Sequence, residues 1–184
     1  MQEQKTGIVR RLDYLGRVVL PKEMRKTLRW KDNDPLEMYT VKDELVIRKY
    51  SPTGAILPYA ADVAEGICEL IEKPCFITDT DEIIYVTGGK YKELVGKKIS
   101  DEFDKTIRSG KSLLISRSDG GEIISPAKNE IFNAENEVVV PIYQNGYGYG
   151  AVAVFDNEKE RTFNANDVKI VRLAASVLAK QFGE

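Results

Sequence analysis

The stretch that decides the fold of the N-terminal region is Thr6–Arg29, TGIVRRLDYLGRVVLPKEMRKTLR. Between Lys5 and Lys31, nine lysines and arginines stand against two acidic residues, a net charge of +7 in a chain whose total is −2. The same stretch also carries the apolar pattern of folded structure. Such a charge imbalance inside a structured segment indicates a nucleic-acid contact surface.

Two strands and a short helix are predicted within this stretch. Thr6–Leu12 and Arg17–Leu20 have the composition of strands, and Gly16 stands between them, where a turn needs a residue that tolerates positive φ. Pro21 favours a helix start, because its missing N–H would be unpaired at the first helical position. Lys22–Arg29 then fits two helical turns.

The predicted helix has an apolar face and a basic face. Met24 and Leu28 are spaced i, i+4 and should point inward. Its basic residues, which share the opposite face, are Lys22, Arg25, Lys26 and Arg29. After the helix, Pro35–Val41 and Glu44–Tyr50 are predicted as two strands joined at Lys42-Asp43. Four short strands and one short helix in about fifty residues are too little to bury a core alone, which favours an intertwined dimer.

These residues resemble a known DNA-binding domain. The run Asp13-Tyr14-Leu15-Gly16-Arg17-Val18-Val19-Leu20-Pro21, with Thr6-Gly7-Ile8-Val9-Arg10 before it and Glu23-Met24-Arg25-Lys26-Thr27-Leu28 after it, is similar to AbrB-type transition-state regulators. The resemblance extends from about Lys5 to Tyr50. It implies that two chains intertwine into a swapped-hairpin β-barrel, whose basic face grips double-stranded DNA mostly through phosphates and shape.

The resemblance also implies which residues touch DNA. Carried over by position, they are Arg10, Arg17, Arg25 and Lys26. The basic neighbours Arg11 and Lys22 are predicted to contact DNA as well. Lys26 departs from the family pattern, which has arginine there, so the charge is kept and the bidentate fork is lost. Asn33 replaces the usual glycine and also tolerates the left-handed conformation. The alternative is that these basic residues only form a solvated charged face. DNA binding is the stronger hypothesis, because the charges are nearly all positive and the sequence motif supports it independently of the charge.

Composition excludes several functional classes. The chain has no histidine, which removes Ser-His and Cys-His nucleophile systems and histidine-ligated metal sites. The two cysteines, Cys68 and Cys75, are predicted as buried thiols and are too few for a structural zinc site. We therefore expect no enzyme, no metal and no cofactor. The polar start MQEQKTG lacks the apolar core of a signal peptide, and no apolar run approaches a membrane span, so a cytoplasmic protein without membrane contact is expected.

The charge distribution and a segment with Pro and Gly divide the 184 residues into two predicted domains. Residues 1–50 hold twelve basic and eight acidic residues, a net +4, whereas residues 51–184 hold fifteen and twenty-one, a net −6. Ser51-Pro52-Thr53-Gly54 has no apolar periodicity and marks the boundary. The prediction is a DNA-binding domain at 1–51, a linker at 52–55, and a regulatory and oligomerisation domain at 56–184.

The second domain is predicted as a mixture of helices and hairpins. Long helices are expected at Ile56–Glu72 and from Asn164 to about Phe182, both with wide apolar bands. Strands are expected at Pro74–Asp79, Glu82–Thr87, Lys111–Ser116, Glu137–Tyr143 and Tyr147–Phe155, and short helices at Lys90–Val95 and Ser100–Ser109. Asn145-Gly146 is the strongest hairpin signal. The irregular Arg117–Asn136 stretch is typical of a lid or binding loop.

This order of elements resembles a GAF domain, a small-molecule sensor fold with a central antiparallel sheet. The Gly150-Ala151-Val152 strand and the Thr162-Phe163-Asn164 approach to the last helix support the resemblance. The predicted fold class is therefore α+β, an intertwined AbrB-like barrel followed by a GAF-like domain. The combination resembles the SpoVT family of sporulation regulators. It implies a sequence-tolerant DNA-binding transcription regulator of sporulation genes.

Partners and rival functions follow from the same features. The chain is expected to dimerise through the N-terminal barrel and to form a tetramer through its C-terminal helices. Phe76, Tyr85 and the Arg117–Asn136 loop are the candidates to enclose an unidentified small-molecule ligand. One alternative is an AbrB-fold antitoxin, although the ordered second domain argues against it. Another is an enzyme that reduces methionine sulfoxide with Cys75 as nucleophile, although both cysteines are predicted to lie in the core.

Overall fold

Two compact units, Met1–Tyr50 and Ser51–Glu184, make up the chain. The computed structural model describes residues 7–28, 30–32, 34–50, 53–159 and 162–182. Thr6, Arg29, Asn33, Ser51 and Pro52, which entered the sequence predictions, lie outside the described residues.

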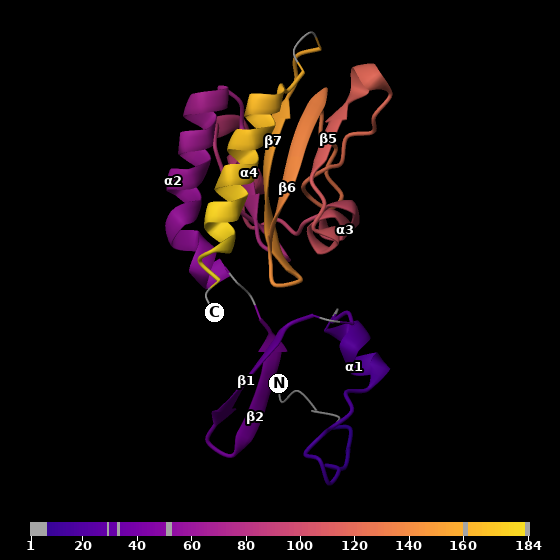
Figure 1. Cartoon of the computed structure of the whole chain (residues 1–184). Coiled ribbons are helices and arrows are strands. Elements are labelled where there is room, and N and C mark those ends of the chain that lie inside the picture. The colour runs from indigo at the N-terminus through magenta and orange to yellow at the C-terminus, as the bar shows by residue number, and fades with distance from the viewer. Residues whose placement is uncertain (1–6, 29, 33, 51–52, 160–161, 183–184) are drawn as a thin grey trace. The chain divides into compact units, whose positions relative to one another are not determined.

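The first unit holds one short helix and one hairpin (Figure 1). Helix α1 spans Lys22–Thr27, and the antiparallel strands β1 and β2 span Leu36–Val41 and Glu44–Lys49. The predicted hairpin is confirmed, and Lys42 in its turn has a φ of 53°. Pro21 is the N-cap of α1, with φ −58° and ψ 144°, rather than its first helical residue.

The two strands predicted before α1 are wrong for the single chain. Gly7–Leu20 has no strand, and its backbone bonds include those that close a turn from Asp13 to Arg17. The Arg17 C=O accepts from the Asp13 N–H at 3.1 Å, and the Gly16 N–H donates to the Asp13 C=O at 3.0 Å. Gly16 has the expected positive φ, 76°. A strand needs a neighbouring backbone to pair with, and this chain alone does not supply one.

The first unit has almost no core of its own. Among its described residues Pro21 is the only one that is buried. Met24 and Leu28, predicted to point inward, are exposed in the single chain. With their neighbours they line a hollow of about 220 Å³ between α1 and the hairpin, formed by Leu20, Met24, Arg25, Leu28, Trp30, Leu45 and Ile47. The apolar pattern is therefore present, but the chain that would cover it is not part of the unit.

The second unit is built on a five-stranded antiparallel sheet in the order β4-β3-β7-β6-β5. Its strands are β3 Cys75–Thr78, β4 Ile83–Val86, β5 Leu113–Ser116, β6 Asn136–Gln144 and β7 Tyr147–Asp156. Its helices are α2 Thr53–Ile71, α3 Asp101–Ser109 and α4 Ala165–Ala179, with the 3-10 turns η1 Gly89–Leu94 and η2 Arg117–Asp119. The β6–β7 hairpin turns at Asn145-Gly146, as predicted.

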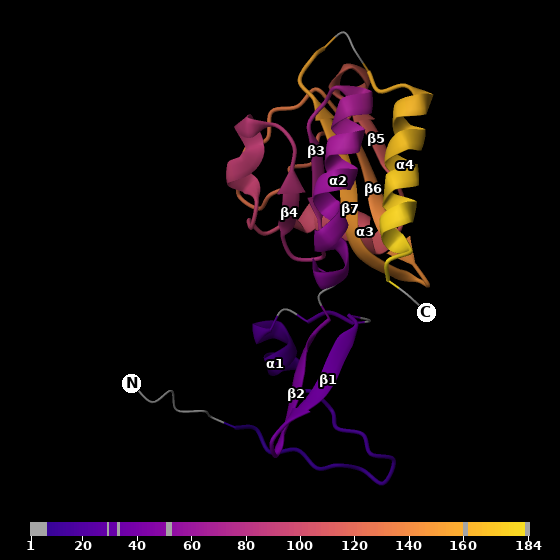
Figure 2. The same cartoon turned by 90° about the vertical axis from the view of Figure 1, so that its left-hand side faces the viewer.

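Each face of this sheet carries its own hydrophobic core. Helices α2 and α4 lie side by side over one face, as Figures 1 and 2 show, and α3 and η1 cover the other. Strand alternation sends Val138, Val140 and Ile142 of β6 toward α2 and α4, and Val139 toward α3. The core below α3 includes an aromatic cluster of Phe76, Tyr91, Phe132 and Phe155.

The helix ends follow local capping signals, with shifts of a few residues from the prediction. Helix α2 begins at Thr53, three residues before the predicted Ile56, and therefore includes much of the proposed linker. Helix α4 starts with the capping box of Asn164 and Asp167 and ends at Ala179 rather than near Phe182. Phe182 is still buried and stacks on Tyr149, with ring centroids 4.1 Å apart.

The irregular stretch between β5 and β6 is anchored to the sheet rather than open. The Arg117 Nε donates to the Ala134 carbonyl at 2.7 Å, and the Ser100 hydroxyl donates to the Ser125 carbonyl at 2.6 Å. The Ile124 N–H donates to Oε1 of Glu137 at 2.9 Å. Glu137 is completely buried on β6, and its Oε2 has no hydrogen-bond partner among the described residues.

Burial raises the pKa of Glu137 to about 7, against the opposing effects of the Ile124 N–H bond and the Arg117 charge. The unfolded carboxyl titrates near 4.5, so the folded state holds the extra proton between that pH and about 7. Stability from this group is therefore full at low pH, falls as the pH rises through this window, and is lowest above it.

Glu137→Gln should remove most of this dependence, because the amide oxygen still accepts from Ile124 and no charge is buried. We expect the variant to flatten the fall in unfolding free energy between pH 5 and 8 by about 2–3 kcal/mol. Urea unfolding at several pH values measures it, with the exposed neighbour Glu122→Gln as the control. Parallel pH profiles for wild type and Glu137→Gln would contradict the prediction.

Candidate nucleic-acid interface

The six predicted DNA-contacting side chains come from two neighbouring segments of the first unit. Arg10 and Arg11 precede the Asp13–Arg17 turn, Arg17 closes it, and the remaining three, Lys22, Arg25 and Lys26, belong to α1. All are exposed except Arg25, which is half-buried. The segments thus present charged groups to solvent at the surface, as a phosphate-binding face requires.

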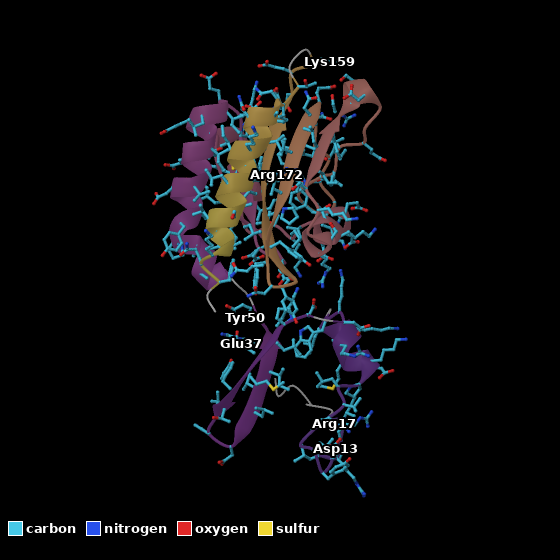
Figure 3. The ribbon with its side chains drawn as sticks, in the orientation of Figure 1. Asp13, Arg17, Glu37, Tyr50, Lys159 and Arg172 are labelled. Carbon is cyan, nitrogen blue, oxygen red and sulfur yellow. The ribbon has the colours of Figure 1, made fainter. Side chains whose placement is uncertain are left out.

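Asp13 organises the turn that carries Arg17. Its Oδ1 accepts from the backbone N–H groups of Leu15, at 2.9 Å, and Arg17, at 2.8 Å. Its Oδ2 accepts from Nε of Arg17 at 2.7 Å. The Arg17 backbone N–H, followed by the Arg17 guanidinium, holds the pKa of Asp13 below its ordinary value. Figure 3 shows the two side chains together at the end of this loop.

Arg25 is held by a different carboxylate in a different way. Its Nη1 donates to Oδ1 of Asp32 at 2.8 Å, and its Nε is buried without a partner among the described residues. The Arg25 side chain is 38% exposed and that of Asp32 is 88% exposed, so the carboxylate is the more solvent-exposed partner of this pair. At the turn the order is reversed, since Arg17 is 69% exposed and Asp13 34%.

The sequence pattern does not predict the roles of the two aspartates. In it, Asp13 is only an opposing charge and part of a family motif. The signal that marks it is local: an aspartate before a glycine turn, four residues ahead of an arginine, is the pattern of a side chain that caps a turn. Asp32 carries no comparable signal, because its arginine lies seven residues away.

The two predicted ligand-binding residues lie on opposite faces of the sheet. Phe76 is completely buried in the aromatic cluster below α3. Tyr85 packs on the α2 side, and its hydroxyl donates to Glu65 at 2.7 Å, a bond that raises the pKa of the phenol. Because Tyr85 pairs with Ile77 and not with Phe76, alternation separates the two rings. The expectation that both enclose one ligand with the Arg117–Asn136 stretch is corrected accordingly.

Cys75, the cysteine considered as a nucleophile, is not accessible in the folded chain. Cys75 is completely buried at the start of β3, and burial raises the pKa of its thiol. Cys68 is half-buried on α2. In the described part of the chain, no group of His, Cys, Asp or Glu side chains is arranged to hold a metal ion. None of its helices is long and apolar enough to cross a membrane.

Comparison with known proteins gives two family matches. Residues 56–183 match the family described as "Stage V sporulation protein T C-terminal, transcription factor". Residues 9–55 match the family described as "Antidote-toxin recognition MazE, bacterial antitoxin".

Relatives agree with these matches. Stage V sporulation protein T of Bacillus subtilis (strain 168) is 36% identical over 177 residues, which cover 96% of this chain and 97% of the relative. Transition state regulatory protein AbrB of the same organism is 47% identical over 49 residues, 27% of this chain and 51% of the relative.

Solved structures share the fold of the second unit. A segment of a methyl-accepting chemotaxis protein, residues 122 to 287, has a TM-score of 0.58 at 17% identity, over 69% of this chain and 88% of that structure. The GAF-B domain of DevS from Mycobacterium smegmatis has a TM-score of 0.55 at 13% identity, over 72% and 93%. The second unit therefore has a GAF-like fold, as predicted.

Proposed function

Because the chain belongs to the stage V sporulation protein T family of transcription factors, we propose that it grips double-stranded DNA through Arg10, Arg11, Arg17, Lys22, Arg25 and Lys26. It is a transcription regulator of sporulation with an AbrB-like DNA-binding first unit. The observation that carries the residue assignment is the gathering of these exposed cations on two adjacent segments. The proposed localisation of the protein is the cytoplasm, where it would meet DNA.

The DNA-binding form is a dimer of first units. Support comes from the apolar side chains that the single chain leaves exposed, among them Val9, Leu12, Val18 and Val19, and from the hollow below α1. A second chain would cover them and supply the strand partners that Gly7–Leu20 lacks. Lysines and arginines that contact phosphates carry little sequence information, so recognition rests mostly on DNA shape and deformability.

Arg17→Ala should weaken operator binding by the full chain at least tenfold, about 1.4 kcal/mol, because it removes a fixed guanidinium from each basic face. The melting temperature should change little, since the side chain is mostly exposed. Fluorescence anisotropy with a labelled duplex measures the affinity. The matched control is Arg48→Ala, an arginine of similar exposure, 62%, that pairs with Glu37 on the hairpin. Equal losses in both variants would make the effect nonspecific.

A fragment of residues 1–51 should be dimeric and should bind DNA more weakly than the full chain. The fragment keeps the segments that need a partner chain and loses whatever brings two dimers together. Analytical ultracentrifugation of the fragment measures whether it is dimeric. The slope of log affinity against log salt, which scales as roughly −0.9 per neutralised phosphate, should be steeper for the full chain. Avidity can add roughly 10²–10⁴ without new contacts. A monomeric fragment, or equal slopes and affinities, would argue against this arrangement.

The second unit is proposed to join two dimers into a tetramer through α2 and α4. Large apolar side chains stay exposed on both helices, namely Leu57, Tyr59, Leu70, Leu173 and Val177. The exposed charges of the two helices are opposite in sign. Those of α2 are Asp62, Glu65 and Glu69, and those of α4 are Lys169 and Arg172. Pairing α2 of one chain with α4 of another would cover the apolar groups and match the charges, as a two-fold interface requires.

Leu173→Glu should lower the oligomeric state while the unit stays folded, because Leu173 is 67% exposed in the single chain. Leu178 is unsuitable for this test, since it is completely buried in its own core. Native mass spectrometry reports the oligomer and any retained small molecule together. Leu114→Glu, at an exposed position on the edge strand β5, is the control. An unchanged tetramer in the folded Leu173→Glu protein would exclude this face.

A ligand-sensing role for the second unit has one candidate position. The hollow beside Tyr85 has a volume of about 360 Å³ and is lined also by Glu65, Cys68, Thr87 and Lys92. The antitoxin alternative is favoured by the match of residues 9–55 alone. Binding of this chain to a toxin encoded beside it, with loss of toxicity, would establish that alternative.

A further inference from the structure

We infer that Asp13 is a positioning residue for DNA binding, which holds the guanidinium of Arg17 in the orientation that meets a phosphate. This inference rests on the proposed function, because it assigns a role to the partner of a proposed contact residue. The inference rests on three hydrogen bonds that the Asp13 carboxylate accepts, two from backbone N–H groups of its turn and one from the Arg17 side chain.

The geometry divides the donors of Arg17 between two tasks. Oδ1 of Asp13 fixes the turn through the N–H groups of Leu15 and Arg17, and Oδ2 accepts from Nε at 2.7 Å. A guanidinium has five N–H donors, so both Nη groups stay available for phosphate oxygens. The bonds from Arg17, first from its backbone N–H and then from its guanidinium, favour the charged carboxylate and lower the pKa of Asp13. Gly16, with φ 76°, allows the tight turn that brings the two side chains together.

Exposure shows which partner faces the solvent. The Arg17 side chain is twice as exposed as that of Asp13, 69% against 34%, so the cation is the more accessible partner of this pair. At the other ion pair the anion Asp32 is the more exposed partner, and Arg25 is the more sheltered one. An approaching phosphate would therefore meet the cation first at Arg17 and the carboxylate first at Arg25.

Two opposing effects act on DNA affinity at such a pair. A carboxylate near the interface repels phosphate, which weakens binding. A carboxylate that fixes a long side chain in advance removes part of the entropy cost of ordering it on binding, which strengthens binding. For the sheltered Asp13 the second effect dominates, and for the exposed Asp32 the first.

The experiment compares Asp13→Asn with Asp32→Asn in the full chain, with affinity measured on the same duplex at the same salt. Each substitution removes one negative charge per chain from the basic unit, so charge alone predicts tighter binding in both. Asn at position 13 keeps the Oδ1 acceptor for the turn, but its Nδ2 is a donor and cannot accept from Nε. We expect Asp13→Asn to weaken binding roughly three- to tenfold. Asp32→Asn should bind as tightly as wild type or more tightly.

A double-variant cycle separates positioning from damage to the fold. In an Arg17→Ala background, Asp13→Asn should cause no further loss, because the side chain it positions is gone. A turn that merely destabilises the unit would weaken binding in both backgrounds, and that result would overturn the inference. Tighter binding by Asp13→Asn in the presence of Arg17 would overturn it as well. If Arg17→Ala itself leaves affinity unchanged, the proposed function fails instead, so the two failures are distinguishable.

Discussion

The first unit leaves its apolar side chains uncovered in the single chain, and the proposed assembly and DNA binding both depend on this constraint. Burial of apolar surface is the dominant favourable term in folding, and fifty residues with a single buried proline among those described gain little of it. The basic residues sit on the same segments, residues 10–26, whose apolar neighbours need a partner. In the proposed dimer, a substitution in that apolar set would weaken DNA binding without touching an arginine, because folding and pairing of the two chains would be linked.

The second unit is the opposite case, because its sheet has a core on each face within one chain. Even its polar interior is largely matched: Lys73, nearly buried, contacts Asp156 at 3.0 Å and Glu158 at 2.9 Å. Glu137 is less well matched, because its Oε2 lacks a partner among the described residues. Among the large apolar side chains that this unit leaves exposed are those on the outer face of α2 and α4.

Turns and helix ends, which depend on a few neighbouring residues, were predictable from the sequence. Asn145-Gly146 turns the central hairpin with φ values of 52° and 86°, and Ser100 and Asn164, at which two helices are predicted to begin, are the N-caps of α3 and α4. Features that depend on distant or second-chain contacts were not predictable in the same way. The strand prediction for Thr6–Leu12 failed because strand pairing needs a partner that the single chain does not provide.

The side of the sheet to which a side chain points is the other property that was not predictable from the sequence. Phe76 and Tyr85 are both aromatic residues on neighbouring strands, but the register that places Tyr85 opposite Ile77 sends the two rings to opposite faces. The same limit applies to the charges of the first unit, because a count gives Asp13 and Asp32 equal weight. Among the described residues Arg11, Lys22 and Lys26 have no ion pair, whereas Arg17 and Arg25 are each tied to a carboxylate. A cation without an ion-pair partner is free to adjust to the spacing of phosphates, and in the proposed complex a guanidinium held by a carboxylate would help to set the register of the protein on the duplex. A surface that combines both kinds suits a regulator that reads DNA shape more than base sequence, and that combination depends on where each carboxylate sits rather than on net charge.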